Sequence, residues 1–145
     1  MRYLLDTCVI SELVRPHPDQ AVASWVRMHN ELDLHLSVLT LGEIEKGIGR
    51  LPASPRRAEL ELWLREELAG RFAGRLLTVD AEIARVWGRV QAGLSLGGKQ
   101  MGAVDGLLSA TARVHDLVLV SRNTADFHDP AVQALNPWEG SLHSE

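Results

Sequence analysis

Acidic and amide side chains at four places in the sequence could together bind a divalent metal ion. Asp6 directly follows the apolar segment YLL, and Glu43 and Asp105 lie in segments with helical apolar spacing. Asn123 and Asp126 follow a late apolar segment, LVLV. Carboxylates that meet in one pocket repel one another and have raised pKa values unless a cation shares them. Oxygen ligands without His or Cys favour Mg²⁺ or Mn²⁺ over zinc.

Such a site suits the hydrolysis of phosphodiester bonds. A metal ion binds a phosphate oxygen, lowers the pKa of a bound water and stabilises the charge that develops in an in-line displacement. No nucleophilic side chain is needed for this chemistry. The sequence therefore predicts a metal-dependent nuclease, provided that the fold brings these groups into one pocket.

Each acid also has a purely structural interpretation. Asp6 could cap the helix that follows it, with Thr7 sharing the task, and for Asp6 alone the cap is the better explanation. Asp105 begins a helix, where the helix dipole favours an acid. Gly106 beside it predicts free space, and the apolar residues around it predict burial, which would leave the carboxylate in need of a partner.

Glu43 lies beside the apolar stripe of its helix rather than opposite to it. The structural alternative is a surface glutamate assisted by Lys46, three residues later. Gly47 weakens that alternative, because a glycine costs about 1 kcal/mol of helix propensity relative to alanine and could clear space over the acid. Lys46 and Arg50 could hold a phosphate backbone on the same side.

The segment from Ser121 to Phe127, SRNTADF, is rich in residues that cap and turn the backbone on their own. A turn is therefore its structural interpretation. In the functional interpretation, Asn123 or Asp126 is an outer metal ligand and Arg122 contacts a phosphate.

A parallel sheet would bring these residues together. Apolar segments at residues 2–5, 34–38, 76–79 and 117–120 predict four strands, and their continuous apolar character is typical of strands buried on both faces. In an open parallel sheet, ligands bind beyond the carboxyl ends of the strands. We therefore expect an α/β fold with a mainly parallel sheet of four to five strands, covered on its faces by helices.

Helices are predicted where apolar residues recur three and four positions apart. The expected apolar faces are Val22, Trp25, Val26 and His29; Leu41, Ile44, Ile48 and Leu51; Leu60, Trp63, Leu64 and Leu68; and Ile83, Val86, Trp87, Val90 and Leu94. Pro55 suits the first turn of the third helix. Gly97 and Gly98 should end the fourth, and a last helix is expected from about Ala103 to His115.

Length and composition agree with one domain over residues 1–139, followed by a disordered tail over 140–145. No segment approaches the roughly 20 apolar residues of a membrane span, so we expect a soluble, cytoplasmic protein that does not contact membranes. Cys8 is the only cysteine, which excludes a disulfide framework and a zinc pattern. The net charge of −4 argues against coating nucleic acid by charge alone, but not against an enzyme with a bound cation.

Four strings stand in the order and approximate spacing of known family motifs: LDTCVISEL, LTLGEIEKGI, VDGLLSATA and LVSRNTADF. Through them, the chain from residue 3 to about residue 138 resembles the VapC and FitB-type PIN-domain toxins. The resemblance implies a three-layer α/β/α fold and a Mg²⁺-dependent endoribonuclease, with Mn²⁺ able to substitute. It further implies a toxin of a type II toxin–antitoxin pair, usually a homodimer. A small antitoxin would inhibit it and provide the only contact with operator DNA.

The resemblance also assigns roles to residues. Asp6, Glu43 and Asp105 would be the core acids and the metal ligands, and Asp126 matches the acid of the closing RNxxDF pattern and would complete the catalytic set. In other PIN branches the fourth acid falls nearer Asn123, so the fourth ligand stays open. Residues expected to contact RNA are Thr7, Lys46, Arg50, Ser121, Arg122 and Asn123.

The chain departs from the family pattern at two positions. Cys8 stands where Asn is common and Ser121 where Thr is usual. Ser121 keeps the hydroxyl, whereas Cys8 removes an amide that could orient Asp6.

Two alternative functions stay open. One is a catalytically weak PIN-fold binding module that acts with its antitoxin on DNA, and the other is a DNA nuclease with a similar carboxylate site.

Overall fold

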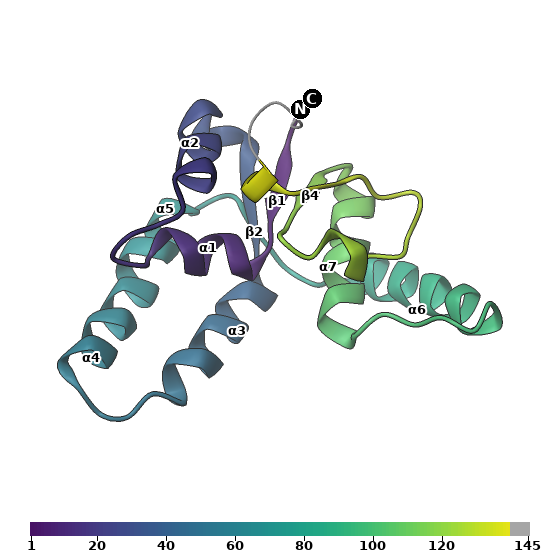
Figure 1. Ribbon diagram of the computed structural model, residues 1–145. Coiled ribbons are helices and arrows are strands. Elements are labelled where there is room, and N and C mark those ends of the chain that lie inside the picture. The colour runs from purple at the N-terminus through teal and green to yellow at the C-terminus, as the bar shows by residue number, and fades with distance from the viewer. Residues whose placement is uncertain (140–145) are drawn as a thin grey trace.

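A computed structural model describes residues 1–139 of the chain (Figure 1). All five strands of its sheet are parallel and stand in the order β3-β2-β1-β4-β5. They are β1 (Tyr3–Leu5), β2 (Leu34–Ser37), β3 (Leu76–Leu77), β4 (Val118–Val120) and β5 (Ala134–Leu135). The tail expected over residues 140–145 lies outside the described residues.

The helices are α1 (Thr7–Leu13), α2 (Gln20–Met28), α3 (Val38–Gly49), α4 (Pro55–Leu62), α5 (Ala69–Arg71), α6 (Ala81–Leu96) and α7 (Ala103–His115). A π-helical segment, Trp63–Leu68, joins α4 to α5, so residues 55–71 form one continuous helix. Short 3₁₀ turns lie at Glu31–Asp33, Thr124–Asp126 and Pro137–Glu139. None of the helices within residues 1–139 combines the length and apolar character that crossing a membrane requires.

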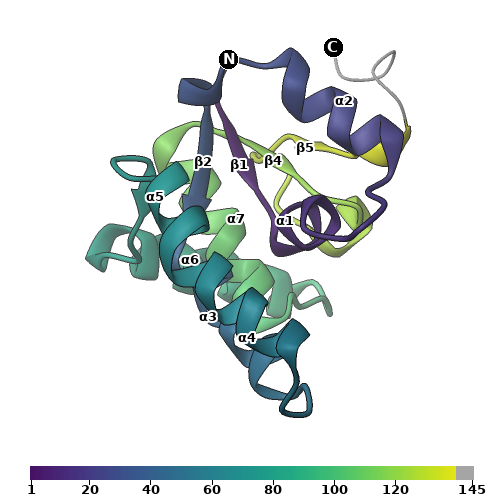
Figure 2. The same ribbon diagram turned by 90° about the vertical axis from the view of Figure 1, so that its left-hand side faces the viewer.

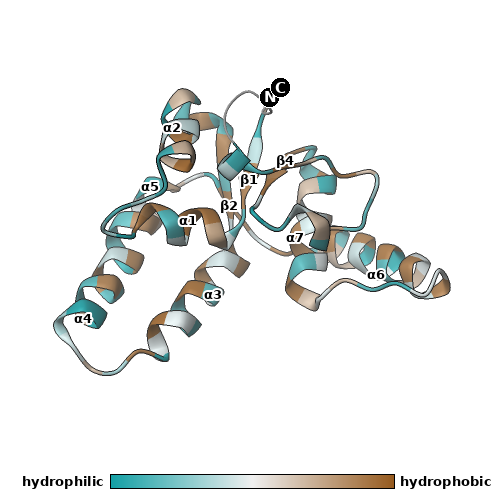
Figure 3. Cartoon of the chain, viewed as in Figure 1, coloured by the Kyte–Doolittle hydropathy of each residue, from teal (hydrophilic) through white to brown (hydrophobic). Residues whose placement is uncertain are grey.

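Both faces of the sheet are covered because successive residues of a strand point to opposite sides. Tyr3 and Leu5 of β1 pack into the larger core with α1, α2 and α3, whereas Leu4 packs against α7. Helix α6 packs on the outside of α7 (Figures 1 and 2). Figure 3 shows apolar and polar residues alternating around the helices, as amphipathic helices on a sheet require. The three-layer α/β/α prediction is confirmed.

Local signals explain most element boundaries. Pro55 stands in the first turn of α4, Gly97 caps the end of α6, and α7 has the predicted bounds. The second predicted strand is one residue too long, since Ser37 accepts the Leu39 N–H at 3.0 Å and starts α3 there. The strand predicted over 76–79 contains only two strand residues, and β5 was not located because its two residues form no apolar run.

Candidate active site

Asp6 and Ser121 directly follow the neighbouring parallel strands β1 and β4, at the same edge of the sheet. The N–H of Asp6 donates to the Val120 carbonyl and that of Ser121 to the Leu135 carbonyl, both at 2.9 Å. Both residues are therefore still held by the sheet ladder. Their side chains are buried, and the Ser121 hydroxyl donates to Asp6 Oδ2 at 2.7 Å.

Asp6 also caps helix α1. Its Oδ1 accepts the N–H of Thr7 at 2.7 Å, which is the cap expected from the sequence. The cap occupies one carboxylate oxygen, while the other receives Ser121. These bonds fix the orientation of the carboxylate, so the structural and functional interpretations of Asp6 are compatible.

Glu43 is connected to the start of α1 through Thr7. The Thr7 hydroxyl donates to Glu43 Oε1 and lies 3.1 Å from the hydroxyl oxygen of the fully buried Thr40. Within residues 1–139 Lys46 forms no ion pair with Glu43. Glu43 is therefore not a surface glutamate assisted by Lys46. Thr40 was not predicted from the sequence. Its position one turn before Glu43 on α3 places it next to that acid on the helix surface, and this spacing could have indicated it.

Asp105 lies half-buried in the first turn of α7, as predicted. Burial raises the pKa of its carboxyl above the ordinary value of 3.8, and the negative charges of Asp6, Asp126 and Glu43 raise it further. The negative charges of the other three acids therefore act on Asp105 through space. Such a cluster favours either a bound proton or a bound cation.

The four acids do not form a closed metal cage. Among residues 1–139, no three His, Cys, Asp or Glu side chains lie close enough together to hold a metal ion as they stand. The donors themselves are carboxylates and hydroxyls, which are the oxygen ligands that Mg²⁺ and Mn²⁺ prefer. Together with the raised pKa of Asp105, this donor set fits a divalent cation.

Asp126 and Asn123 occupy the turn after β4, and both are exposed. Asp126 ends the 3₁₀ turn, and its negative charge helps to raise the pKa of Asp105. The backbone N–H of Asn123 donates to Ser121 Oγ at 3.1 Å. Asn123 thereby supports the serine that holds Asp6, while Asp126 contributes charge to the acid cluster.

The three basic residues expected to contact RNA are all exposed. Lys46 and Arg50 extend from α3 beyond Glu43. The Arg122 guanidinium lies over the ring of Trp138, 5.1 Å from its centroid, so a phosphate contact would compete with a cation–π interaction.

Cys8 occupies the junction between the two turns that carry Asp6 and Ser121. Its Sγ lies 3.7 Å from Asp6 Oδ2 and 3.6 Å from Ser121 Oγ, and it accepts the N–H of Arg122 at 3.4 Å. Burial raises the pKa of the Cys8 thiol, so the sulfur carries its proton at neutral pH. Cys8 is therefore a weak donor and acceptor that joins the two turns.

The two glycines beside the acids differ in whether they leave free space. A Cβ on Gly106 would lie 2.8 Å from Trp87 Nε1 and 2.9 Å from Gln91 Nε2, so α6 fills that room. The expectation for Gly106 was wrong. Gly47 faces open space, and with Glu43 it lines a cavity of about 180 Å³ between α1, α3 and α4.

A family model for the PIN domain matches residues 3–132. The chain belongs to the PIN-domain family. Among its curated relatives is the VapC ribonuclease Y4jK of Sinorhizobium fredii, which is 35% identical over 94% of this chain and 97% of that protein. Toxin FitB of Neisseria gonorrhoeae is 34% identical over 93% of this chain and 97% of its own length. These relatives confirm the VapC/FitB-type resemblance.

Solved structures agree with the fold of this PIN domain. A structure of FitAB bound to an IR36 DNA fragment contains a chain that is 32% identical and superposes with a TM-score of 0.87. The match covers 94% of this chain and 95% of that one. The parallel sheet and its covering helices are therefore those of the family.

Proposed function

We propose that this PIN-domain protein is a Mg²⁺-dependent endoribonuclease, with Mn²⁺ able to substitute. The observation that carries the proposal is that the negative charges of Asp6, Glu43 and Asp126 act on Asp105 near the carboxyl end of β1, which Asp6 directly follows. The name of the curated VapC ribonuclease supports RNA as the substrate.

Asp6, Glu43 and Asp105 would hold the metal ion, with Asp126 as a fourth acid. The ion would supply charge stabilisation and an activated water for hydrolysis of the phosphodiester bond. The chain's own groups prepare the site: the Thr7 N–H and the Ser121 hydroxyl orient Asp6, and the Thr7 hydroxyl orients Glu43.

Substrate would be bound by the exposed polar groups around the acids. Lys46, Arg50 and Asn123 are exposed beside them and can contact the phosphates of a strand that lies over the site. Arg122 can do so when it leaves Trp138. We expect their individual substitution to weaken RNA binding more than it slows the chemical step, because they contact phosphates and hold no metal.

We further propose that the protein is the toxin of a type II toxin–antitoxin pair and acts in the cytoplasm as a homodimer. The support is the toxin FitB and the FitAB complex bound to DNA, since operator DNA would be reached only through the antitoxin. The cavity beside Glu43 has apolar walls that include Leu51, Leu60 and Trp63, which suits an apolar segment of such an inhibitor.

One observation favours an alternative. Because the acids do not form a closed ligand set within residues 1–139, the chain could be a catalytically weak binding module that works in the antitoxin complex on DNA. That function requires the fold and the partner surface but not the carboxylates.

Cleavage assays on purified, antitoxin-free protein test the proposal. We expect RNA to be cut with Mg²⁺ or Mn²⁺, no cutting in EDTA, and loss of cleavage in Asp6→Asn and Asp105→Asn. Glu43→Gln should also abolish cleavage and toxicity on expression, whereas the matched variant Glu45→Gln, on an exposed part of the same helix, should retain both. Full activity of the acid variants or in EDTA would exclude the metal site, and cutting of DNA in place of RNA would make the protein a DNA nuclease.

A further inference from the structure

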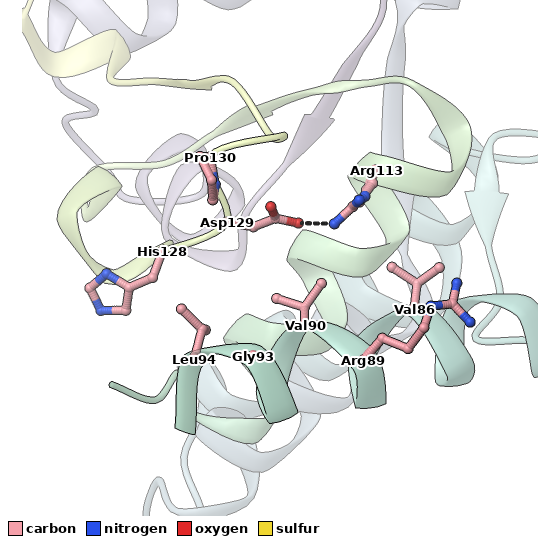
Figure 4. Close-up of a pocket in the computed structure, with 9 residues that line it drawn as sticks. All are labelled: Val86, Arg89, Val90, Gly93, Leu94, Arg113, His128, Asp129 and Pro130. Atoms are coloured by element: carbon pink, nitrogen blue, oxygen red, sulfur yellow. Dashed lines mark hydrogen bonds and ion pairs between the residues drawn. The ribbon is translucent and has the colours of Figure 1, made fainter. Parts of the chain in front are cut away.

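A second concave site is lined by none of the four acids. It is a cavity of about 450 Å³ between α6, α7 and the loop at residues 128–130 (Figure 4). Val86, Val90 and Leu94 form an apolar wall along α6, and Pro130 faces them from the loop. A cavity of this size and apolar character can hold a small organic group such as a nucleobase.

Positive side chains surround this apolar wall. Arg113 Nη1 pairs with Asp129 Oδ2 at 3.0 Å, and the buried Asp129 also accepts the Ala131 N–H at 3.0 Å. Arg113 stays 45% exposed, so part of its guanidinium can reach a ligand. Arg89 is exposed on α6 and pairs with no carboxylate within residues 1–139. Two arginines against one aspartate give the cavity a net positive charge.

The cavity and the acid cluster share two elements of the chain. Helix α7 carries Asp105 in its first turn and Arg113 in its last turn, eight residues and therefore roughly 12 Å farther along the axis. His128 follows Asp126 by two residues in the loop after β4. A single strand held over the acids would therefore reach the cavity along α7 and this loop.

We propose that the cavity is a subsite for one nucleotide of single-stranded RNA that flanks the cleaved bond. The base lies against the α6 wall and Pro130, while Arg89 and the exposed part of Arg113 contact its phosphate. An acidic protein segment would satisfy the arginines equally well, but the helix and loop that the cavity shares with the acids favour the substrate strand. This inference rests on the proposed ribonuclease function.

Comparing Arg89→Ala with the matched variant Arg85→Ala distinguishes RNA binding in this cavity from attraction of RNA by any surface arginine. Both arginines are exposed on α6 one turn apart, and only Arg89 lines the cavity. Binding of a fluorescent single-stranded RNA of mixed sequence is followed by anisotropy in EDTA, where no cleavage interferes. Arg89→Ala should weaken binding about fivefold and lower the salt dependence of log K by about 0.7, the value for one phosphate contact on a single strand. Arg85→Ala should match the wild type.

Equal binding by the two variants would overturn the subsite. So would an Arg89→Ala protein that binds RNA normally but changes its molar mass in light scattering, since the cavity would then belong to a protein interface. Failure of the proposed function gives a different result. If the wild-type protein cuts no RNA with Mg²⁺, the ribonuclease function is refuted. If Arg89→Ala weakens RNA binding in that case and Arg85→Ala does not, the cavity is still a site that binds RNA.

Discussion

At the scale of single residues, Asp6 shows how one carboxylate serves both the fold and the site. Oδ1 caps α1 and Oδ2 receives the Ser121 hydroxyl. The cap fixes the side chain in the orientation that the other bond requires. The structural role thus pre-organises the residue instead of competing with its function.

Asp105 opposes stability at neutral pH, because its pKa is raised in the folded protein. Between the ordinary pKa of 3.8 and the raised value, the folded state binds a proton that the unfolded state has lost, so stability falls as pH rises through that window. Asp105→Asn should therefore raise the Tm of metal-free protein at pH 7 by roughly 2 °C, a small gain because solvent screens a half-exposed group. Below about pH 3.8 the two proteins should melt alike.

Asp129→Asn provides the contrast for this experiment. Asp129 is buried and paired with Arg113, so its substitution should lower the Tm in the same buffer. Thermal melts in EDTA from acidic to neutral pH measure both effects. An Asp105→Asn protein that is less stable than the wild type at neutral pH would show that repulsion among the acids is not significant.

Cys8 is expected to position Asp6 and the turn after β4. Cys8→Ala removes the acceptor of the Arg122 N–H and the contact with Asp6 Oδ2, so it should cost about 1 kcal/mol of stability. It should also raise the Mg²⁺ concentration needed for half-maximal cleavage, whereas Cys8→Ser should restore most of that affinity. A merely space-filling cysteine would lower the Tm in both variants without changing the metal requirement.

The sequence predicted the candidate acids and the helix cap made by Asp6, but not the side chains that bond these acids. Asp6, Glu43 and Asp105 could be located because each lies at a strand end or on a helix face with a recognisable pattern. The bond between Thr7 and Glu43 could not be predicted, because it depends on how α1 and α3 pack across 36 residues of sequence. Only the packed structure shows that Oδ1 of Asp6 caps α1 and that Oδ2 accepts the Ser121 hydroxyl.

At the scale of elements, the packing of α6 on α7 sets the position of Asp105. A Cβ on Gly106 would meet Trp87 and Gln91 under 3.0 Å, and Gln91 in turn bonds the backbone of Met101 just before α7. Gly106→Ala should therefore push the helices apart, cost about 1 to 3 kcal/mol and reduce cleavage by displacing Asp105.

Gly88→Ala is the matched control for that variant. Gly88 lies within α6, and a Cβ added there would have no neighbouring side chain within 4 Å, so alanine should add roughly 0.5 to 1 kcal/mol of stability. Urea unfolding and the cleavage rate measure both variants. Equal stabilisation by the two alanines would refute the role of close helix packing at Gly106.

Helix positions followed from the sequence better than strand positions. The last helix, predicted from about Ala103 to His115, has these bounds in the structure as α7. Strands of two residues, β3 and β5, carry too little pattern to fix their ends, and their pairing partners are distant in sequence.

At the scale of the whole molecule, the fold gathers negative charge at one edge of a parallel sheet in a chain of net charge −4. A polyanion approaches such an edge only if cations offset the acids. Lys46 and Arg50 are exposed at the end of α3, and Arg89 and Arg113 are exposed around the cavity between α6 and α7. We therefore expect a metal ion to occupy the centre of the acids before substrate binds.

A crystal structure of the full chain with Mn²⁺, with anomalous scattering recorded at the manganese edge, tests this requirement most directly. We predict an anomalous peak bound by carboxylate oxygens of Asp6, Glu43 and Asp105, and no peak there in crystals of Asp105→Asn. Ordered, unliganded carboxylates at saturating Mn²⁺, or a peak bound elsewhere on the chain, would contradict the metal site.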